Sequence, residues 1–164
     1  MGKCEGKFLI KNNKVSFKEF GDDYYESLKK YRKEDFSQIA ITAYIFLEIL
    51  EKKIRKYSDR SFCINDVHLG DNADGAQQEI NDRIMNVNPC SHSVASLLEV
   101  ILLLKDITSN ESVEIEYVTY SFEEKEEDTY VTLHNTGYVE YDGPKNKVEL
   151  IRLGKMITGI RHGE

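Results

Sequence analysis

The chain contains little that would cross-link it or divide it into rigid segments. Its 164 residues include no Trp, two Pro and three Cys. The odd number and wide spacing of Cys4, Cys63 and Cys90 argue against a disulfide framework and favour a reducing compartment. Few Pro residues, with 40% hydrophobic and 31% charged residues, are typical of a folded globular chain and not of a disordered one. We therefore expect one domain, residues 1–164.

Long hydrophobic runs are also missing. The two most apolar stretches, residues 39–50 and 94–104, are well short of the roughly 20 residues that a helix needs to cross a bilayer. The N-terminal apolar run is too short for a signal peptide, and Gly6 stands where a myristoylation signal has Ser or Thr. The sequence therefore predicts a cytoplasmic protein without a membrane partner.

Recognisable catalytic and cofactor motifs are missing as well. The glycines match neither a P-loop nor a G-x-G-x-x-G pattern, and no G-x-S-x-G elbow accompanies the serines. The loop at 70–75 resembles a calcium loop, but Gly70 and Asn81 occupy the first and last ligand positions, where carboxylates are required. We therefore predict no cofactor and no catalytic residue.

A metal-binding or hydrolytic enzyme is the alternative, because ligand-capable side chains are present. Cys63 with His68 and Cys90 with His92 could contribute to a mixed zinc site, and His134 is a further candidate. Neither pair has the tight C-x2-C spacing of a structural zinc site, so buried cysteines are the simpler interpretation.

Negative charge, in contrast, is concentrated in one short segment. Residues 111–128 contain eight carboxylates and one base, Lys125, and the resulting charge of −7 equals that of the whole chain. Strand-like sequences flank the acidic turn, so we expect the charge on a rigid hairpin. A fixed acidic field attracts a basic protein surface and repels the phosphates of nucleic acid. The sequence thus predicts a protein-binding module with no nucleic-acid partner.

Alternating side chains along residues 113–122 place acidic residues at one end of a strand face and aromatic residues at the other. Two interpretations of this face remain open. A helix could cover Tyr120 and Phe122 while the glutamates are merely solvated, or the face could be a docking patch with Tyr130 and His134 as cross-strand neighbours.

In the docking interpretation, buried aromatic anchors would provide most of the affinity, and the carboxylates would raise the association rate by about ten to a thousand fold. The predicted partner-binding residues are Glu114, Glu116, Tyr120, Phe122, Glu123, Glu124, Glu126, Glu127, Asp128, Tyr130 and His134.

Hydrophobic periodicity predicts helices mainly in the first two thirds of the chain and strands in the last third. We expect a hairpin at 8–17 that turns at Asn12 and Asn13, and a capping box of Asp35 and Gln38 before the longest helix. The other expected elements are helices at 22–33, 36–54, 76–87 and 88–104, and strands at 61–65, 113–122, 129–141 (broken at 135–137), 148–153 and 155–160. Without βαβ alternation, this order predicts an α+β fold, with an antiparallel sheet of about five strands packed with N-terminal and central helices.

A small acidic α+β chain with the sequence Ser-Val-Glu-Ile-Glu-Tyr-Val-Thr-Tyr-Ser-Phe-Glu-Glu-Lys-Glu-Glu-Asp from Ser112 resembles bacterial immunity proteins, especially those of contact-dependent growth inhibition systems. The resemblance covers the length, element order and acidity of the whole chain, but no diagnostic motif. It implies a monomer that binds a cognate basic nuclease toxin, often a DNase or RNase, as a heterodimer. A toxin strand added at an edge within 8–17 or 148–153 would suit such binding. A structural or assembly subunit is a further alternative.

Overall fold

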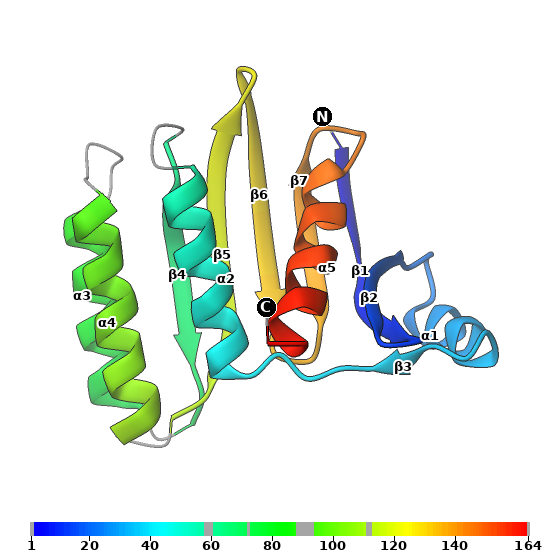
Figure 1. Ribbon diagram of the computed structural model, residues 1–164, viewed down its shortest axis with the longest axis horizontal. Helices are drawn as coiled ribbons and strands as arrows, with labels where there is room; N and C mark the ends of the chain where they lie inside the picture. Colours follow the sequence, from blue (N-terminus) through cyan, green and yellow to red (C-terminus); the bar gives the residue numbers. More distant parts are fainter. Residues whose placement is uncertain (1, 58–60, 72, 88–93, 111–112, 164) are drawn as a thin grey trace.

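The computed structural model describes residues 2–57, 61–71, 73–87, 94–110 and 113–163. Within these residues, seven strands form one antiparallel sheet in the order β2-β1-β7-β6-β5-β4, with β3 beside β1 (Figure 1). The elements are β1 (Gly2–Lys11), β2 (Lys14–Glu19), α1 (Tyr24–Lys33), β3 (Ser37–Gln38), α2 (Ala43–Lys56), β4 (Cys63–Leu69), α3 (Asp74–Val87), α4 (Val94–Asn110), β5 (Ile115–Glu124), β6 (Glu127–His134), β7 (Tyr138–Gly143) and α5 (Val148–Arg161). The predicted α+β class with an antiparallel sheet is confirmed.

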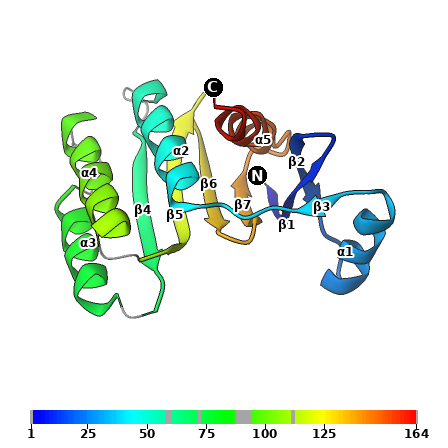
Figure 2. The same cartoon turned by 60° about the horizontal axis from the view of Figure 1, so that its bottom comes forward.

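Two helices, α2 and α5, lie over the same face of the sheet (Figures 1 and 2). The core fills the space beneath them, where Ile49, Val131 and Leu153 are at most 2% exposed. Helices α3 and α4 pack together beside β4, and α1 lies at the opposite end of the molecule (Figure 2). The other face of strands β7, β6 and β5 has no described helix over it, and we call it the open face.

The N-terminal hairpin forms as the sequence predicts. Lys11 pairs with Lys14, and the turn residues Asn12 and Asn13 have φ angles of 53° and 61°. Positive φ at both central residues is the type I′ turn that matches the twist of a hairpin. Gly6 is needed in β1, because a Cβ there would lie 2.2 Å from the carbonyl oxygen of Lys18. The hairpin therefore depends on two local features that the sequence provides.

The longest expected helix begins later than the sequence suggested. Helix α2 starts at Ala43, and the Thr42 hydroxyl caps it by accepting a hydrogen bond from the Ile45 amide at 3.3 Å. Asp35, the expected cap, has a φ of 68°, and the chain after it is extended and pairs with β1 as β3. The capping-box prediction was therefore wrong, because pairing with the sheet outweighs local helix signals. The predicted Asn88-Pro89 helix start lies outside the described residues.

The C-terminal segment is a helix, and the strands predicted at 148–153 and 155–160 are wrong. Leu150, Leu153, Ile157 and Ile160 are all buried, and their spacing of three or four residues is the repeat of one helix face. Gly154 allows this helix to approach the sheet, since a Cβ there would lie 3.1 Å from the carbonyl oxygen of Val15. No receptive strand edge therefore exists at 148–153.

On both outer edges of the sheet, side chains form hydrogen bonds with backbone amide or carbonyl groups. On β2, the Val15 amide donates to Thr158 Oγ1 at 2.9 Å. On β4, the Leu69 amide donates to Gln77 Oε1 at 2.7 Å, and Gln77 Nε2 donates to the Val67 carbonyl at 2.8 Å. An added strand needs these same groups for its ladder. The outer edges therefore have fewer free backbone groups for a partner strand than we expected from the sequence of the N-terminal hairpin.

The cysteines also differ from expectation at one position. Cys63 is disulfide-bonded, whereas the uneven spacing of the cysteines favoured free thiols. Cys4 is a free thiol and is partly buried. Cys90, which the sequence placed with His92 in a possible metal site, lies outside the described residues. The odd number of cysteines therefore did not exclude a disulfide.

Candidate functional site

The structure buries the two residues that the sequence favoured as affinity anchors. Tyr120 and Phe122 are 1% and 2% exposed. The Phe122 ring stacks on Tyr57 with centroids 4.3 Å apart, and Tyr120 stacks on Phe62 at 5.7 Å. The expectation of an exposed aromatic patch at Tyr120 and Phe122 is therefore not met, and the alternative, in which these side chains are covered, describes the structure.

A bulge in β5 changes which of its side chains face the core. Ile115 pairs with Leu69 and Tyr117 pairs with His68, so Glu116 is an extra residue opposite β4. As a result Ile115 faces the core together with Val118, although strict alternation assigned these two residues to opposite faces. Glu116 is left partly exposed at the margin of the open face, and the neighbouring candidate Glu114 is exposed just before the strand.

The acidic turn is the tip of the β5–β6 hairpin, as the sequence indicated. Glu124 pairs with Glu127, and Glu123 pairs with Asp128. Lys125 and Glu126 form the turn, with φ angles of 54° and 64°. Four of the carboxylates are exposed, those of Glu123, Glu126, Glu127 and Asp128.

Glu124 differs from the other carboxylates of the tip. Its Oε1 atom lies 3.0 Å from Arg152 Nη1 of α5. This ion pair holds Glu124 on the helix side of the sheet, so we assign it to structure and not to the partner surface.

A row of four rings crosses the open face. His68 of β4, Tyr117 of β5, His134 of β6 and Tyr138 of β7 lie side by side, and their successive ring centroids are 5.0, 5.2 and 5.1 Å apart. The row exists because Tyr117 pairs directly with both His68 and His134 in the sheet. It supplies a partly exposed aromatic surface of the kind that protein interfaces favour.

Carboxylates flank this row. His68 Nε2 lies 3.5 Å from Glu116 Oε2, and His134 Nε2 lies 3.2 Å from Glu140 Oε1. The Glu140 side chain is 56% exposed and the His134 side chain 28%. The structure thus brings two predicted residues, Glu116 and His134, into one surface with a residue that sequence reasoning missed.

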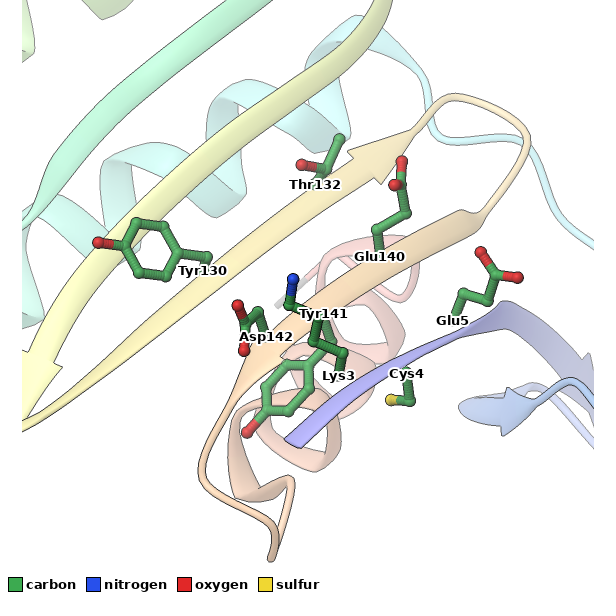
Figure 3. A pocket seen from close by; sticks show the side chains of 8 residues that line it. All are labelled: Lys3, Cys4, Glu5, Tyr130, Thr132, Glu140, Tyr141 and Asp142. Atoms are coloured by element: carbon green, nitrogen blue, oxygen red, sulfur yellow. The ribbon is translucent and has the colours of Figure 1, made fainter. Parts of the chain in front are cut away.

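Beside the row, a hollow of about 360 Å³ opens between strands β1, β7 and β6 (Figure 3). Glu5 of β1 and Glu140 of β7 face each other directly across the two strands. Like charges in this position destabilise a sheet. The hydroxyl of Tyr138 donates a hydrogen bond to Glu5, and Glu140 contacts His134, but no described cation lies within ion-pair distance of Glu5. The hollow therefore holds negative charge that a cation would stabilise.

The neighbouring row of cross-strand residues lines the rest of the hollow. Asp142 of β7 lies between Lys3 of β1 and Tyr130 of β6. Tyr130, a predicted partner-binding residue, is 45% exposed. An exposed aromatic ring beside carboxylates is the arrangement that holds the ammonium or guanidinium group of a basic side chain.

Sequence reasoning missed most residues of this surface because β1 lies far from β6 and β7 in the chain. The sheet order places Glu5 next to Glu140 across 135 positions of sequence, and no local pattern indicates that pairing. The alternating Tyr138-Val-Glu-Tyr-Asp142 was the one available signal, since period two places Tyr138, Glu140 and Asp142 on the same face.

Five tyrosines are expected to make the fold sensitive to alkali. Burial, with nearby carboxylates, raises the pKa of Tyr57, Tyr117, Tyr120 and Tyr138, and that of Tyr141 to about 12. Above about pH 10 the folded chain therefore retains phenolic protons that the unfolded chain loses, so the free energy of unfolding falls as pH rises. Lys53, whose pKa burial lowers, acts in the opposite sense but is a single group.

Urea unfolding at about pH 9, 10 and 11, with tyrosinate absorbance followed in parallel, measures this effect. We expect a decrease in stability at each step and delayed ionisation of these tyrosines until the chain unfolds. A free energy of unfolding that is constant over this interval would contradict the prediction.

Within the part of the chain that the structure describes, no group of three or more His, Cys, Asp or Glu is arranged to hold a metal ion. None of the described helices combines the length and apolar character needed to span a membrane. Comparison of the chain with protein-family models, curated proteins and solved structures gives no match to any of them. The fold and the surface thus define an α+β domain with an acidic, aromatic open sheet face.

Proposed function

We propose that this protein binds a basic protein domain on its open face and inhibits it, and that the partner is the nuclease toxin of a contact-dependent growth inhibition pair. The chain would then be the immunity protein. The observation that carries the proposal is the opposed pair Glu5 and Glu140, which lies in a hollow beside the exposed ring of Tyr130.

A lysine or arginine side chain of the partner would relieve the repulsion between Glu5 and Glu140. Arginine fits best, because its planar guanidinium can bond two carboxylate oxygens and stack on the face of Tyr130. The cation would be only partly desolvated in an open hollow, so its pairing can contribute to affinity without the full cost of burying a charge.

A nuclease is a suitable partner on electrostatic grounds. It needs a cationic surface to bind the phosphate backbone of its substrate. The open face would compete with nucleic acid for these same cations, and the row from His68 to Tyr138 adds area for close packing. Binding would therefore inhibit the nuclease by occupying its substrate surface.

The test uses the tagged chain to capture proteins from a lysate of the source cell at low salt, followed by stepwise elution with salt. Each retained protein is separated from the chain under denaturing conditions, refolded, and assayed for DNA and RNA hydrolysis with and without the chain. We expect one basic protein whose nuclease activity is lost when an equimolar amount of chain is added back. If no retained protein has nuclease activity that the chain inhibits, the proposal is wrong.

Neutralising the hairpin tip is expected to slow association. In the variant with Glu123→Gln, Glu126→Gln, Glu127→Gln and Asp128→Asn, the association rate should fall about tenfold or more at low salt, because the tip attracts the basic partner over a distance. The dissociation rate should change little, since these side chains are exposed and their charges act mainly over a distance. Stopped-flow mixing with the isolated partner at several salt concentrations measures both rates.

A matched variant removes the same charge elsewhere, at Asp22, Glu26, Glu34 and Glu79, all of which are exposed. Its association rate at low salt should fall less than that of the tip variant. Equal losses in the two variants would mean that net charge, and not the position of the tip, controls association.

A further inference from the structure

A second concave site lies on the helix side of the sheet. A groove of about 430 Å³ runs between α2 and α5, which face each other over the same sheet face (Figure 1). The five cations that line it are Lys52, Lys53 and Lys56 of α2, and Arg152 and Lys155 of α5. A cluster of five cations is unexpected in a chain whose net charge is −7.

Two of the five cations have carboxylate partners. Lys53 forms a buried ion pair with Glu149, and Arg152 Nη1 lies 3.0 Å from Glu124 Oε1. The other three are Lys52, Lys56 and Lys155, and among the described residues no carboxylate lies within ion-pair distance of them. The groove thus contains three positive charges that the described part of the protein does not neutralise.

Helix-terminal electrostatics explains only part of this arrangement. Basic residues in the last turn of α2, such as Lys56, interact favourably with the negative end of its dipole. Lys155 has no such role, because it lies in the middle of α5, which runs from Val148 to Arg161. Its position facing Lys52 and Lys56 across the groove adds repulsion in the absence of an anion.

We propose that this groove binds a small ligand carrying two or more linked phosphates, such as a nucleoside triphosphate. Lysine ammonium groups are compact point charges that suit phosphate oxygens. The groove also has an apolar wall of Met156 and Ile160, and a methionine thioether packs well against an aromatic base. The site lies on the opposite side of the sheet from the open face, so this inference does not depend on the proposed function.

Isothermal titration of the full chain with ATP, with inorganic tripolyphosphate and with adenosine, at low salt, tests the proposal. We expect both anions to bind with a dissociation constant below about 1 mM and adenosine to give no heat. Tighter binding of ATP than of tripolyphosphate identifies a nucleotide as the ligand, whereas equal binding identifies the phosphates alone; either supports the site. If neither anion binds, the proposal is wrong.

The double variant Lys52→Ala/Lys155→Ala removes one unpaired cation from each helix and should weaken anion binding by about tenfold or more. Both side chains are exposed, so the fold should tolerate the change. The control Lys29→Ala/Lys33→Ala removes the same charge from exposed positions of α1, at the far end of the molecule (Figure 2), and should leave binding unchanged. Equal loss in the two variants would show that the anions respond to net charge alone, and would overturn the proposal.

Discussion

Replacing Glu149 with Ala is expected to lower the free energy of unfolding by about 3–5 kcal/mol, the typical cost of removing one partner of a buried ion pair. The side chains of Lys53 and Glu149 are 1% and 2% exposed. The hydroxyl of Tyr120 donates a further hydrogen bond to the same carboxylate oxygen. The variant would leave the Lys53 ammonium in the core without its counter-charge.

The aromatic rings around Lys53 cannot replace the lost carboxylate. Lys53 Nζ lies 5.5 Å from the ring centroid of Tyr57, 5.7 Å from that of Tyr120 and 5.9 Å from that of Phe122. A cation over an aromatic face gains about 2 kcal/mol when desolvated, whereas moving an ion into the interior costs several kcal/mol. The rings therefore reduce the penalty but leave most of it.

Urea unfolding at neutral pH, followed by circular dichroism, measures the change. Glu79→Ala, at an exposed position of α3, is the control and should stay within about 0.5 kcal/mol of the original chain. The double variant Lys53→Met/Glu149→Leu replaces both charges with apolar groups and should recover most of the lost stability. A Glu149→Ala variant as stable as the control would show that Lys53 is already neutral or reaches water.

The buried ion pair of Lys53 and Glu149 joins residues far apart in the chain. Such contacts explain why local sequence patterns predict the hairpins but not the C-terminal helix. Hairpins such as that at Asn12 and Asn13 are set by turn chemistry between neighbouring residues. The segment from Val148 contains apolar residues that suit either a strand or a helix, and Glu149 in a core position gave no local signal. Its helical state is stabilised by distant contacts, with Lys53 of α2 and Val15 of β2.

The candidate site was likewise predictable only where it depends on residues that are neighbours in the sequence. The acidic hairpin tip is a local feature, and its carboxylates lie where the sequence placed them. Strict alternation placed Tyr120 and Phe122 on the same strand face as Glu114 and Glu116, which suggested an exposed face. The bulge at Glu116, which depends on pairing with β4, removes Glu116 from that face, so the aromatic residues lie on the core side without it. The hollow between Glu5 and Glu140 requires the sheet order, which a single sequence does not contain.

Reversing one charge in that hollow is expected to separate binding from stability. Under the proposed function, Glu140→Lys should weaken binding of the basic partner by about a hundredfold, because the new ammonium occupies the place of the partner's cation, and like-charge contacts cost several kcal/mol. The same change should stabilise the free chain by about 0.2–1 kcal/mol, since the introduced ammonium would face Glu5 with opposite charge across β1 and β7.

The opposite signs of these two effects distinguish a binding role of Glu140 from a purely structural one. Titration of the isolated partner gives the dissociation constant, and urea unfolding gives the stability of the free chain. Glu26→Lys changes the charge by the same amount on α1 and should affect binding only through the weaker long-range attraction. Binding that is unchanged in Glu140→Lys would remove the hollow from the interface. A variant that loses stability and binding together would mean that Glu140 supports the sheet, through its contact with His134, and does not meet the partner.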